Sequence, residues 1–538
     1  MPKLDWLTRP EDERTVASIP YRLLEAVPEL SHGDEQTENM LIQGDNLEAL
    51  KSLLPYYAGR VKCIYADPPF NTQQAFPDYD DNLEHTKWLS MVYPALELQR
   101  ELLSMDGTLF IHIDDNELGY LIAIADEVMG RKNRIAVVTF KQGAATGHKA
   151  INPGPVNTTN FVLIYARQKP DWKPNRLFTG RQRDNRYNQF LTNPEAPYAQ
   201  WKLEPLSKAF SRHSGKKIGV LKKELGDGYE DVLNDFVIAN ATRVFRPARP
   251  DFDAVSEEAR EMITKSQEDP TRTYCLRRAD YSDMYFLGGE RLLSYREKLK
   301  PIDGELIAGE PLTTLWDDLL SNNLHNEGGV EMPKGKKPEA LIKRVFELST
   351  SPKDLVLDAY LGSGTTAAVA HKMGLQYIGI ERGEHAFTKC QPRLTSVVGG
   401  DQSGVSKSVR WKGGGGFRFY RLAGPIFDEK GHINPSIRFD HLAAHVWFAE
   451  TRTPLSPKRR RSPLLGKHGG TAYYLLFNGI LGDKRPDGGN VLTRKVLSEL
   501  PAHDGPRVIY GESSRLSLTA LKQLGVIFKQ TPYDVKVR

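Results

Sequence analysis

The stretch DLVLDAYLGSGTT, residues 354–366, decides the fold of this chain. It begins with an apolar strand pattern, and its glycines Gly362 and Gly364 lead into a helical pattern. A strand, a glycine turn and a helix form a unit of a parallel sheet, in which ligands bind at the carboxyl ends of strands. The next apolar strand pattern, YIGIE, ends at Glu381. These residues predict an α/β fold with a doubly wound, mostly parallel sheet.

Strand and helix patterns also alternate on the N-terminal side of this stretch. Apolar runs at 61–67, 107–114, 135–140 and 161–165 predict strands, and helical spacing occurs at 88–103 and 118–129. The alternation stops near residue 169 and resumes at 337–396. We therefore expect an α/β core that is split by an insertion. The expected parts are an N-terminal extension (1–40), a first core half (41–170), an inserted domain (171–310), a second core half (311–398), and a glycine-rich linker with a C-terminal α/β or mixed domain (399–538).

Composition excludes several classes of protein. The 538 residues include 39% hydrophobic and 26% charged residues, which is typical of globular domains and not of disordered chains. Three cysteines, far apart, give neither a disulfide framework nor a zinc pattern, and the histidines show no metal spacing, so we expect no metal site. No apolar run is long enough to span a membrane, and the charged N-terminal stretch MPKLDWLTRPEDERTV lacks an apolar signal core, which predicts a cytoplasmic protein without membrane contact.

A second motif, Asp67-Pro68-Pro69-Phe70, follows the apolar strand VKCIYA. Two prolines in a row can simply end a strand with a rigid turn. The chemical interpretation is methylation of an aromatic amine, whose lone pair is delocalised into its ring. The Asp67 carboxylate would accept one N–H and the Pro68 carbonyl the other, while Phe70 would stack on a base that has left its duplex.

The glycine stretch has the features of a site for an adenosine-type cofactor. Glycines allow the backbone to approach a ligand, and an acid at the end of the next strand can accept both ribose hydroxyls. The third glycine of G-x-G-x-x-G and the G-K-[ST] of a P-loop are both missing, which disfavours a dinucleotide and a nucleoside triphosphate. Asp358 suits a cationic, methionine-like group. The alternative is an ordinary glycine turn with Glu381 facing solvent.

The order of these motifs resembles the β class of amino-group DNA methyltransferases, in which the catalytic string precedes the cofactor string. Three other stretches resemble the same class: Gly44-Asp45-Asn46, Lys336-Lys337-Pro338-Glu339, and the segment from Ser406 to Phe417. The last resembles the modification subunits of type III restriction–modification systems. The resemblance covers roughly residues 40–170 and 310–425, and is weak in the insertion.

The resemblance implies a Rossmann-like methyltransferase core, S-adenosylmethionine as methyl donor and the N6 amine of adenine as acceptor. It assigns catalysis to Asp67, Pro68, Pro69 and Phe70. It assigns the cofactor site to Asp45, Asn46, Lys337, Pro338, Asp358, Tyr360, Gly362, Gly364, Thr365 and Glu381. Phe70 stands where tyrosine is commoner and Tyr360 where phenylalanine often stands; both changes keep an aromatic face.

The insertion begins with a basic, aromatic segment. Residues 171–223 hold 12 Lys and Arg against four acids, with seven aromatics between them. Such a segment suits contact with phosphates and bases, although a charge run is often only a solvated surface. We interpret the insertion as a target-recognition domain for double-stranded DNA. The total charge of +5 therefore reflects basic segments that offset an acidic site.

The resemblance also implies a restriction (helicase–nuclease) subunit as partner and a homodimer. Two alternatives stay open at this stage. One is methylation of the N4 amine of cytosine, and the other is a DNA-recognition subunit whose methyltransferase core is a non-catalytic scaffold. His112 and His148 are interpreted as structural, because N-methylation without a covalent step requires no histidine. The basic run Lys458–Arg461 is interpreted as a loop between prolines.

Overall fold

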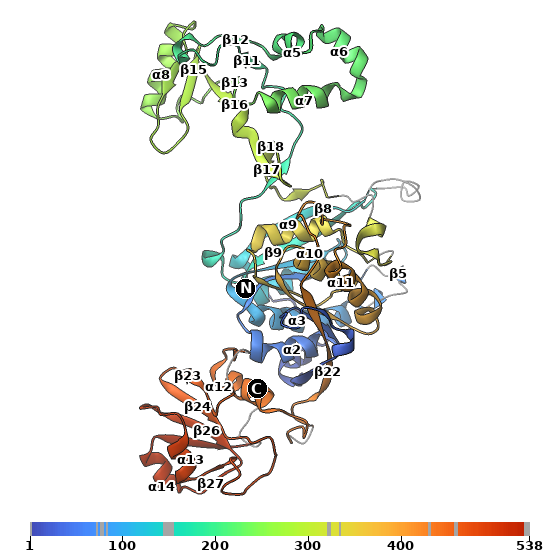
Figure 1. Ribbon diagram of the computed structural model, residues 1–538, viewed down its shortest axis with the longest axis vertical. Helices are drawn as coiled ribbons and strands as arrows, with labels where there is room; N and C mark the ends of the chain where they lie inside the picture. Colours follow the sequence, from blue (N-terminus) through green and yellow to red (C-terminus); the bar gives the residue numbers. More distant parts are fainter. Residues whose placement is uncertain are drawn as a thin grey trace. The chain divides into compact units, whose positions relative to one another are not determined.

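The computed structural model describes residues 3–71, 74–75, 80–81, 84–143, 155–319, 324–332, 335–428, 432–456 and 461–531. His148 and most of the basic run 458–461 lie outside these ranges. The chain divides into two units (Figure 1): unit 1 comprises Met1–Asn175 and Thr313–Arg538, and unit 2 comprises Arg176–Leu312.

One large mixed sheet organises unit 1. In spatial order the described part of this sheet contains β1 (Arg22–Ala26), β22 (Gly416–Pro425), β3 (Met40–Gln43), β21 (Gln376–Glu381), β20 (Leu355–Asp358), β4 (Val61–Ala66), β7 (Leu103–Ile113), β9 (Thr159–Ala166), β8 (Arg134–Lys141) and β19 (Leu315–Trp316), with β2 (His32–Gly33) on β22. The strands from β22 to β7 are parallel, and β9 runs antiparallel to β7 and β8. The prediction of a doubly wound, mostly parallel sheet is confirmed.

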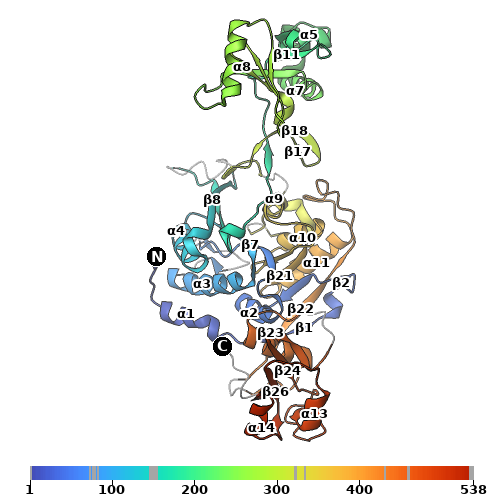
Figure 2. The same cartoon turned by 90° about the vertical axis from the view of Figure 1, so that its left-hand side faces the viewer.

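Helices cover both faces of this sheet. Figure 2 shows α3 (His85–Leu102) and α4 (Leu118–Ala125) on one side of β7, and α10 (Thr365–Lys372) and α11 (Gln391–Val398) on the other side of the sheet. Helix α2 (Asn46–Tyr57) packs with α3 and α1 (Arg9–Ser18) also contacts α3, whereas α9 (Glu339–Ser349) packs with α10. Strands in the middle are buried on both faces, which explains their continuous apolar sequences.

The edge of the sheet differs from the boundaries expected from the sequence. Strand β1 lies in the expected N-terminal extension and β22 in the expected linker region, yet both extend the main sheet. Phe417 and Phe419 alternate with polar residues along β22 and are fully buried. This alternating pattern directly follows a run of glycines, which is typical of a linker. The sequence therefore predicted a linker where the structure has a strand with one apolar face.

The C-terminal part of unit 1 forms a smaller α/β layer. Strands β23 (Leu464–His468), β24 (Thr471–Leu475), β26 (Arg507–Gly511) and β28 (Val526–Gln530) form a sheet in that order, and the last three are parallel. This region also contains α12 (Phe439–Thr451), β25 (Val491–Leu492), α13 (Arg494–Glu499), β27 (Ser513–Ser514) and α14 (Leu518–Gln523). Helix α12 packs against α2 of the main core.

Unit 2 has its own sheets and cores. Strands β12 (Leu203–Pro205), β11 (Gln189–Leu191), β13 (Val244–Ala248), β16 (Glu290–Ser294), β15 (Met284–Leu287) and β14 (Tyr274–Leu276) form an antiparallel sheet, and β10 (Phe178–Gly180), β18 (Glu305–Pro311) and β17 (Leu299–Ile302) form a second one. Its helices are α5 (Leu206–Ser214), α6 (Ile218–Leu225), α7 (Tyr229–Ala239) and α8 (Glu257–Glu268). Across the described ranges of both units, no helix combines the length and the apolar composition that a membrane span requires.

Candidate active site

Three acids lie at the carboxyl ends of neighbouring parallel strands. Asp67 follows the last residue of β4, Asp358 is the last residue of β20, and Glu381 is the last residue of β21. Because β4, β20 and β21 are adjacent and parallel, these carboxyl ends meet at one edge of the sheet. In doubly wound sheets this edge binds ligands.

The Asp67 carboxylate forms an ion pair with Lys337. The Lys337 Nζ lies 2.6 Å from Asp67 Oδ2, and 13% and 16% of the two side chains are exposed. The same ammonium lies 4.7 Å from the centroid of the Phe70 ring. Lys337 stands in the stretch that the resemblance assigns to the cofactor, but its charged end contacts the string assigned to catalysis. Pro338, beside it, is the residue that precedes α9.

The two prolines have different surroundings. The Pro69 carbonyl accepts a hydrogen bond from Nε1 of the buried Trp88, at 2.7 Å. Within the described part of the chain, the Pro68 carbonyl accepts no hydrogen bond. The hydrogen bond from Trp88 therefore holds the turn at Pro69, and the Pro68 carbonyl can accept a hydrogen bond from a ligand.

His112, on β7, supports Phe70 from within the sheet. Its fully buried ring lies between the Tyr65 hydroxyl, 2.8 Å from Nδ1, and the Asn160 amide, 3.2 Å from Nε2. Its ring centroid is 5.4 Å from that of Phe70. Burial, together with the charge of Lys337, holds the pKa of His112 well below its ordinary value. A neutral, doubly hydrogen-bonded imidazole serves as a fixed support and not as a proton carrier.

Asn71, the residue after the string assigned to catalysis, is also held by a buried acid. Asn71 has a positive φ of 59°, and its Nδ2 donates to Oε1 of Glu117 at 2.6 Å. The same carboxylate oxygen lies 2.7 Å from Nδ1 of His85. Glu117 is fully buried, so it stabilises a backbone conformation that a residue with a side chain rarely adopts.

The glycine turn uses backbone conformations that favour glycine. Gly362 and Gly364 have φ values of 56° and 80°. A methyl group on Gly364 would come within 3.3 Å of the Cys390 Cα. The Gly362 N–H donates to Glu381 Oε2 at 2.6 Å, and the Tyr360 N–H donates to Asp358 Oδ1 at 2.8 Å. The two acids thus hold the turn that separates them.

Asp358 is buried and Glu381 is half-buried, and their charges interact. Burial, with a contribution from the nearby charge of Asp67, raises the pKa of Asp358 to about 7. Burial likewise raises the pKa of Glu381 to about 7, with a contribution from Asp358. A cationic ligand would bind favourably beside acids whose pKa is raised by burial, because a nearby positive charge stabilises their ionised forms. This donor set fits the charged methionine end and the ribose hydroxyls of S-adenosylmethionine.

The remaining predicted cofactor residues border the same edge. Asp45 caps α2, and its Oδ1 accepts hydrogen bonds from the N–H groups of Leu47 and Glu48. Asn46 lies beside the side chain of Tyr360. These three residues lie at the ends of β3 and β20, within the glycine-turn region. The Thr365 hydroxyl instead accepts a hydrogen bond from Arg393, at 2.8 Å, and is buried.

A buried ionic network lies beneath the glycine turn. The Glu339 carboxylate contacts Lys372 Nζ at 2.9 Å and Arg393 Nη2 at 2.7 Å, and all three side chains have no exposed surface. Lys372 also contacts Asp401 at 2.7 Å, and Arg393 reaches the backbone of Ser363. The network therefore joins α9, α10, α11 and the glycine turn.

Sequence patterns did not identify this network or the Asn71–Glu117 contact. Glu339 is the last residue of a recognised string and Asn71 directly follows another, and this position is the only signal that the sequence contains. Lys372, Arg393 and Glu117 lie within helices or turns without any distinguishing pattern. No group of histidine, cysteine and acidic side chains suited to a metal ion occurs among the residues that the structure describes.

The sequence profile of the DNA methylase family (N6_N4_Mtase) matches residues 61–391. The chain belongs to this family. The matched range contains the Asp67 string, unit 2, the glycine turn and Glu381.

Individual relatives agree with this membership. A probable type III restriction-modification enzyme HindVI Mod subunit of Haemophilus influenzae is 31% identical over 436 residues, which cover 74% of this chain and 56% of that protein. The type III EcoPI Mod subunit of Escherichia phage P1 is 26% identical, with coverages of 68% and 60%. The chain thus spans less than two thirds of either relative. The solved M1.HpyAVI–SAM complex is 14% identical with a TM-score of 0.31, covering 66% of this chain and 98% of that one.

Proposed function

We propose that this chain transfers a methyl group from S-adenosylmethionine to the N6 amine of an adenine that is flipped out of double-stranded DNA. The main support for this proposal is that Asp67, Asp358 and Glu381 lie at one edge of the sheet. The string Asp67–Phe70 follows β4, and the glycine turn follows the neighbouring strand β20. The proposal includes a cytoplasmic location for the protein.

Asp67 and Pro68 orient the acceptor amine. The Asp67 carboxylate accepts one N6 hydrogen, and the Pro68 carbonyl, which has no partner within the described residues, accepts the other. Two acceptors on the same nitrogen draw its lone pair out of the ring and aim it at the methyl group. As the new N–C bond forms, the departing N6 proton leaves along the hydrogen bond to Asp67, while the electrons of the broken S–C bond stay on sulfur.

Phe70 and its support hold the adenine ring. Phe70 offers an aromatic face, and His112 packs against the ring from inside the sheet. The Lys337 ammonium interacts both with the Asp67 carboxylate and with the face of the Phe70 ring. We infer that Lys337 fixes the direction of the Asp67 carboxylate before the base enters.

Asp358, Glu381 and the glycine turn hold the methyl donor. Glu381 would accept hydrogen bonds from the ribose hydroxyls, Asp358 would face the cationic end, and Asn46, Asp45 and Tyr360 would hold the adenine. When bound there, S-adenosylmethionine supplies an activated methyl group on a positively charged sulfur. The raised pKa values of both acids mean that the site accepts this charge with a release of protons at neutral pH.

We further propose that the chain is the modification subunit of a type III-like restriction–modification system. Its relatives include proteins with that name, although this chain spans only part of their length. The proposal includes unit 2 as the target-recognition domain (residues 171–310 by the sequence boundaries), a restriction subunit as partner, and a homodimer as the active form.

The test uses the purified full chain, methyl-labelled donor and mixed-sequence duplex DNA. Labelled N6-methyladenine is the expected product. N4-methylcytosine alone would refute the choice of acceptor, and absence of both transfer and donor binding would favour a recognition subunit, whose scaffold would not need the donor.

The variant Asp67→Ala separates catalysis from binding. We expect transfer to fall by about 10²–10³-fold or more, as when one positioned catalytic hydrogen-bond partner is removed. Donor binding, measured by calorimetry, should stay close to that of the wild type because Asp358 and Glu381 are unchanged. Equal transfer by Asp67→Ala would remove Asp67 from the mechanism.

A further inference from the structure

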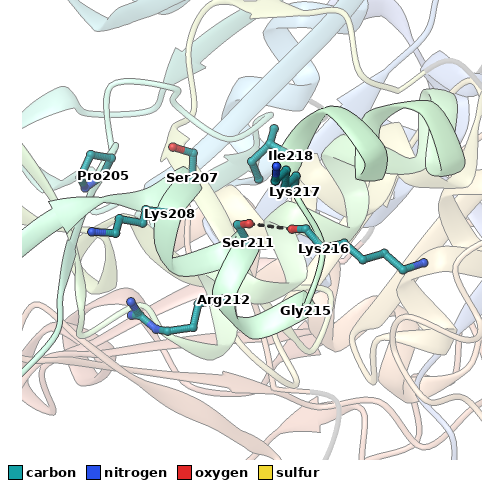
Figure 3. Close-up of a pocket in the computed structure, with 9 residues that line it drawn as sticks. All are labelled: Pro205, Ser207, Lys208, Ser211, Arg212, Gly215, Lys216, Lys217 and Ile218. Carbon is teal, nitrogen blue, oxygen red and sulfur yellow. Dashed lines mark hydrogen bonds between the residues drawn. The ribbon is translucent and has the colours of Figure 1, made fainter.

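Unit 2 contains an open cavity of about 720 Å³ between α5 and the start of α6. Figure 3 shows the cationic side chains that line it: Lys208 and Arg212 come from α5, and Lys216 and Lys217 come from the turn that leads into α6. Ser207 and Ser211 add two hydroxyl groups, and no acidic residue is among those that line the cavity.

Net positive charge in unit 2 is confined to the segment around this cavity, because the rest of the unit, taken together, holds 17 Lys and Arg against 21 Asp and Glu. Residues 205–225 contain six Lys and Arg and one acid, Glu224. The next helix, α7, carries Glu230, Asp231 and Asp235 and no Lys or Arg. A general solubilising surface mixes both signs, so this separation indicates a surface that faces a polyanion.

The base beneath the cavity is rigid. Leu206, Ala209 and Phe210 bury one face of α5 in the core of unit 2, which leaves Lys208 and Arg212 on the opposite face. The turn after α5 is closed by Ser211 Oγ, which donates to the Lys216 carbonyl at 2.6 Å, as Figure 3 shows. Because the backbone that carries these cationic side chains is already ordered, ligand binding would cost less conformational entropy.

The side chains themselves remain available. The exposed fractions of Lys208, Arg212 and Lys216 are 72%, 57% and 50%. Glu204 pairs with Arg212 and lies 3.9 Å from the Lys208 ammonium, and Glu224 lies 2.6 Å from the Lys216 ammonium. Three of the four cations therefore have acidic neighbours outside the cavity. Within the described part of the chain, Lys217 has no acidic partner.

The start of α6 lacks the usual cap. Lys217 occupies the N-cap position without a side-chain hydrogen bond, and the first turn contains no acid. Helix N-termini carry partial positive charge and are stabilised by acids or by bound anions, so two lysines here oppose the helix dipole. A bound anion would reverse this unfavourable arrangement.

We propose that this cavity binds phosphate oxygens of the DNA backbone, and that it contributes affinity without reading sequence. This inference rests on the proposed function, because it assigns one part of DNA binding to a defined surface. Its cations are flexible and carry no base-facing aromatic among the lining residues, as expected for phosphate contacts that position a protein on duplex DNA.

The test compares two triple variants of the full chain. R212Q/K216Q/K217Q removes three charges from the cavity. R249Q/K265Q/R272Q removes three exposed charges from other elements of unit 2 and serves as the matched control. Binding of a fluorescein-labelled, mixed-sequence 40-bp duplex is followed by anisotropy between 50 and 200 mM NaCl.

We expect the slope of log K against log salt to become shallower by about 2–3 in the cavity variant, since each lost phosphate contact contributes about 0.9. The Kd at 150 mM salt should rise on the order of tenfold or more, and methyl transfer at saturating DNA should stay unchanged. The single variant K217A, which breaks no ion pair of the described residues, should lower the slope by about one.

Equal slopes for the cavity variant and its control would overturn the phosphate assignment. A loss of transfer at saturating DNA would also overturn it, because the cavity would then act on catalysis. Failure of the proposed function is distinguishable, since the wild-type chain would then methylate no DNA under any salt condition.

Discussion

The substitution Glu339→Gln tests whether the buried ionic network holds the glycine turn. Gln is the same size, but it removes the charge that Lys372 and Arg393 share at 2.9 and 2.7 Å. It also replaces one carboxylate oxygen with an NH2 donor, so Lys372, which contacts both oxygens, loses one acceptor in either orientation of the amide while remaining buried.

The expected cost follows from this burial. Breaking one partner of a buried ion pair costs about 3–5 kcal/mol, because the remaining charges stay desolvated. Lys372 keeps its contact with Asp401 at 2.7 Å, which places the expected cost near the lower end of that range. In domains of about 150–250 residues, 1 kcal/mol shifts the melting temperature by about 2–4 °C, and the shift is smaller in larger units. Because unit 1 is larger than these domains, we expect its melting temperature to fall by roughly 3–8 °C.

The assay is thermal unfolding followed by tryptophan fluorescence, together with calorimetry of donor binding. Donor affinity should fall with stability, because Arg393 holds Thr365 and Ser363 of the glycine turn. Glu347→Gln is the matched control, since Glu347 lies on the same helix but is 38% exposed and pairs only with Lys343 in the described ion pairs. That change should cost less than about 1 kcal/mol.

A double variant sharpens the test. Glu339→Gln with Lys372→Met removes opposite charges together, and its cost should be smaller than the sum of the two single costs. A melting temperature of Glu339→Gln equal to that of Glu347→Gln would refute the reasoning. So would strictly additive costs in the double variant.

Three further predictions concern the site itself. Gly364→Ala introduces a methyl group at a φ of 80° and within 3.3 Å of the Cys390 Cα, so it should weaken donor binding at least tenfold by calorimetry, whereas unchanged affinity would contradict the role of the turn. Donor affinity should rise as pH increases through about 7, because Asp358 and Glu381 must ionise to bind a cation. The folding stability of the unliganded protein should instead fall as pH rises toward 7, since acids with a raised pKa contribute stability at low pH that is lost as pH approaches 7. The variant Asp358→Asn should flatten the binding profile between pH 6 and 8, and an unaltered profile would exclude Asp358 as its source. His112→Leu should lower kcat about tenfold without changing the pH at which transfer is half-maximal, and a shifted midpoint would show that the imidazole exchanges protons.

The sheet and its catalytic edge could be predicted because both have local signals. Apolar runs mark β4, β20 and β21, and each run ends in an acid or directly before one. The rule that parallel strands place their carboxyl ends together then brings Asp67, Asp358 and Glu381 to one edge. No knowledge of distant contacts was needed for that step.

Contacts between distant parts of the chain could not be predicted in this way. Lys337 pairs with Asp67, and Glu339 pairs with Lys372 and Arg393. Asp67, Lys337 and Glu339 stand in recognised strings, but nothing in the sequence shows which side chains they contact. Their pairing depends on how α9 packs against the neighbouring elements. Strand β22 was missed for another reason, since its alternating pattern is short and follows a glycine run.

The order of strands in the main sheet has a consequence for biosynthesis. Strands β3 and β4 follow each other in the chain, but β21 and β20 lie between them in the sheet. The strands that fill this central gap are translated roughly 290 residues after β4, which takes about 15–60 s at ordinary ribosomal speed. During that interval the backbone N–H and C=O groups along the edges of β3 and β4 that face this gap have no native partner. Nascent chains of this protein should therefore bind holding chaperones until residue 381 has left the ribosome, and ribosome-bound chains that stop at residue 312 should crosslink to such chaperones more than full-length chains do.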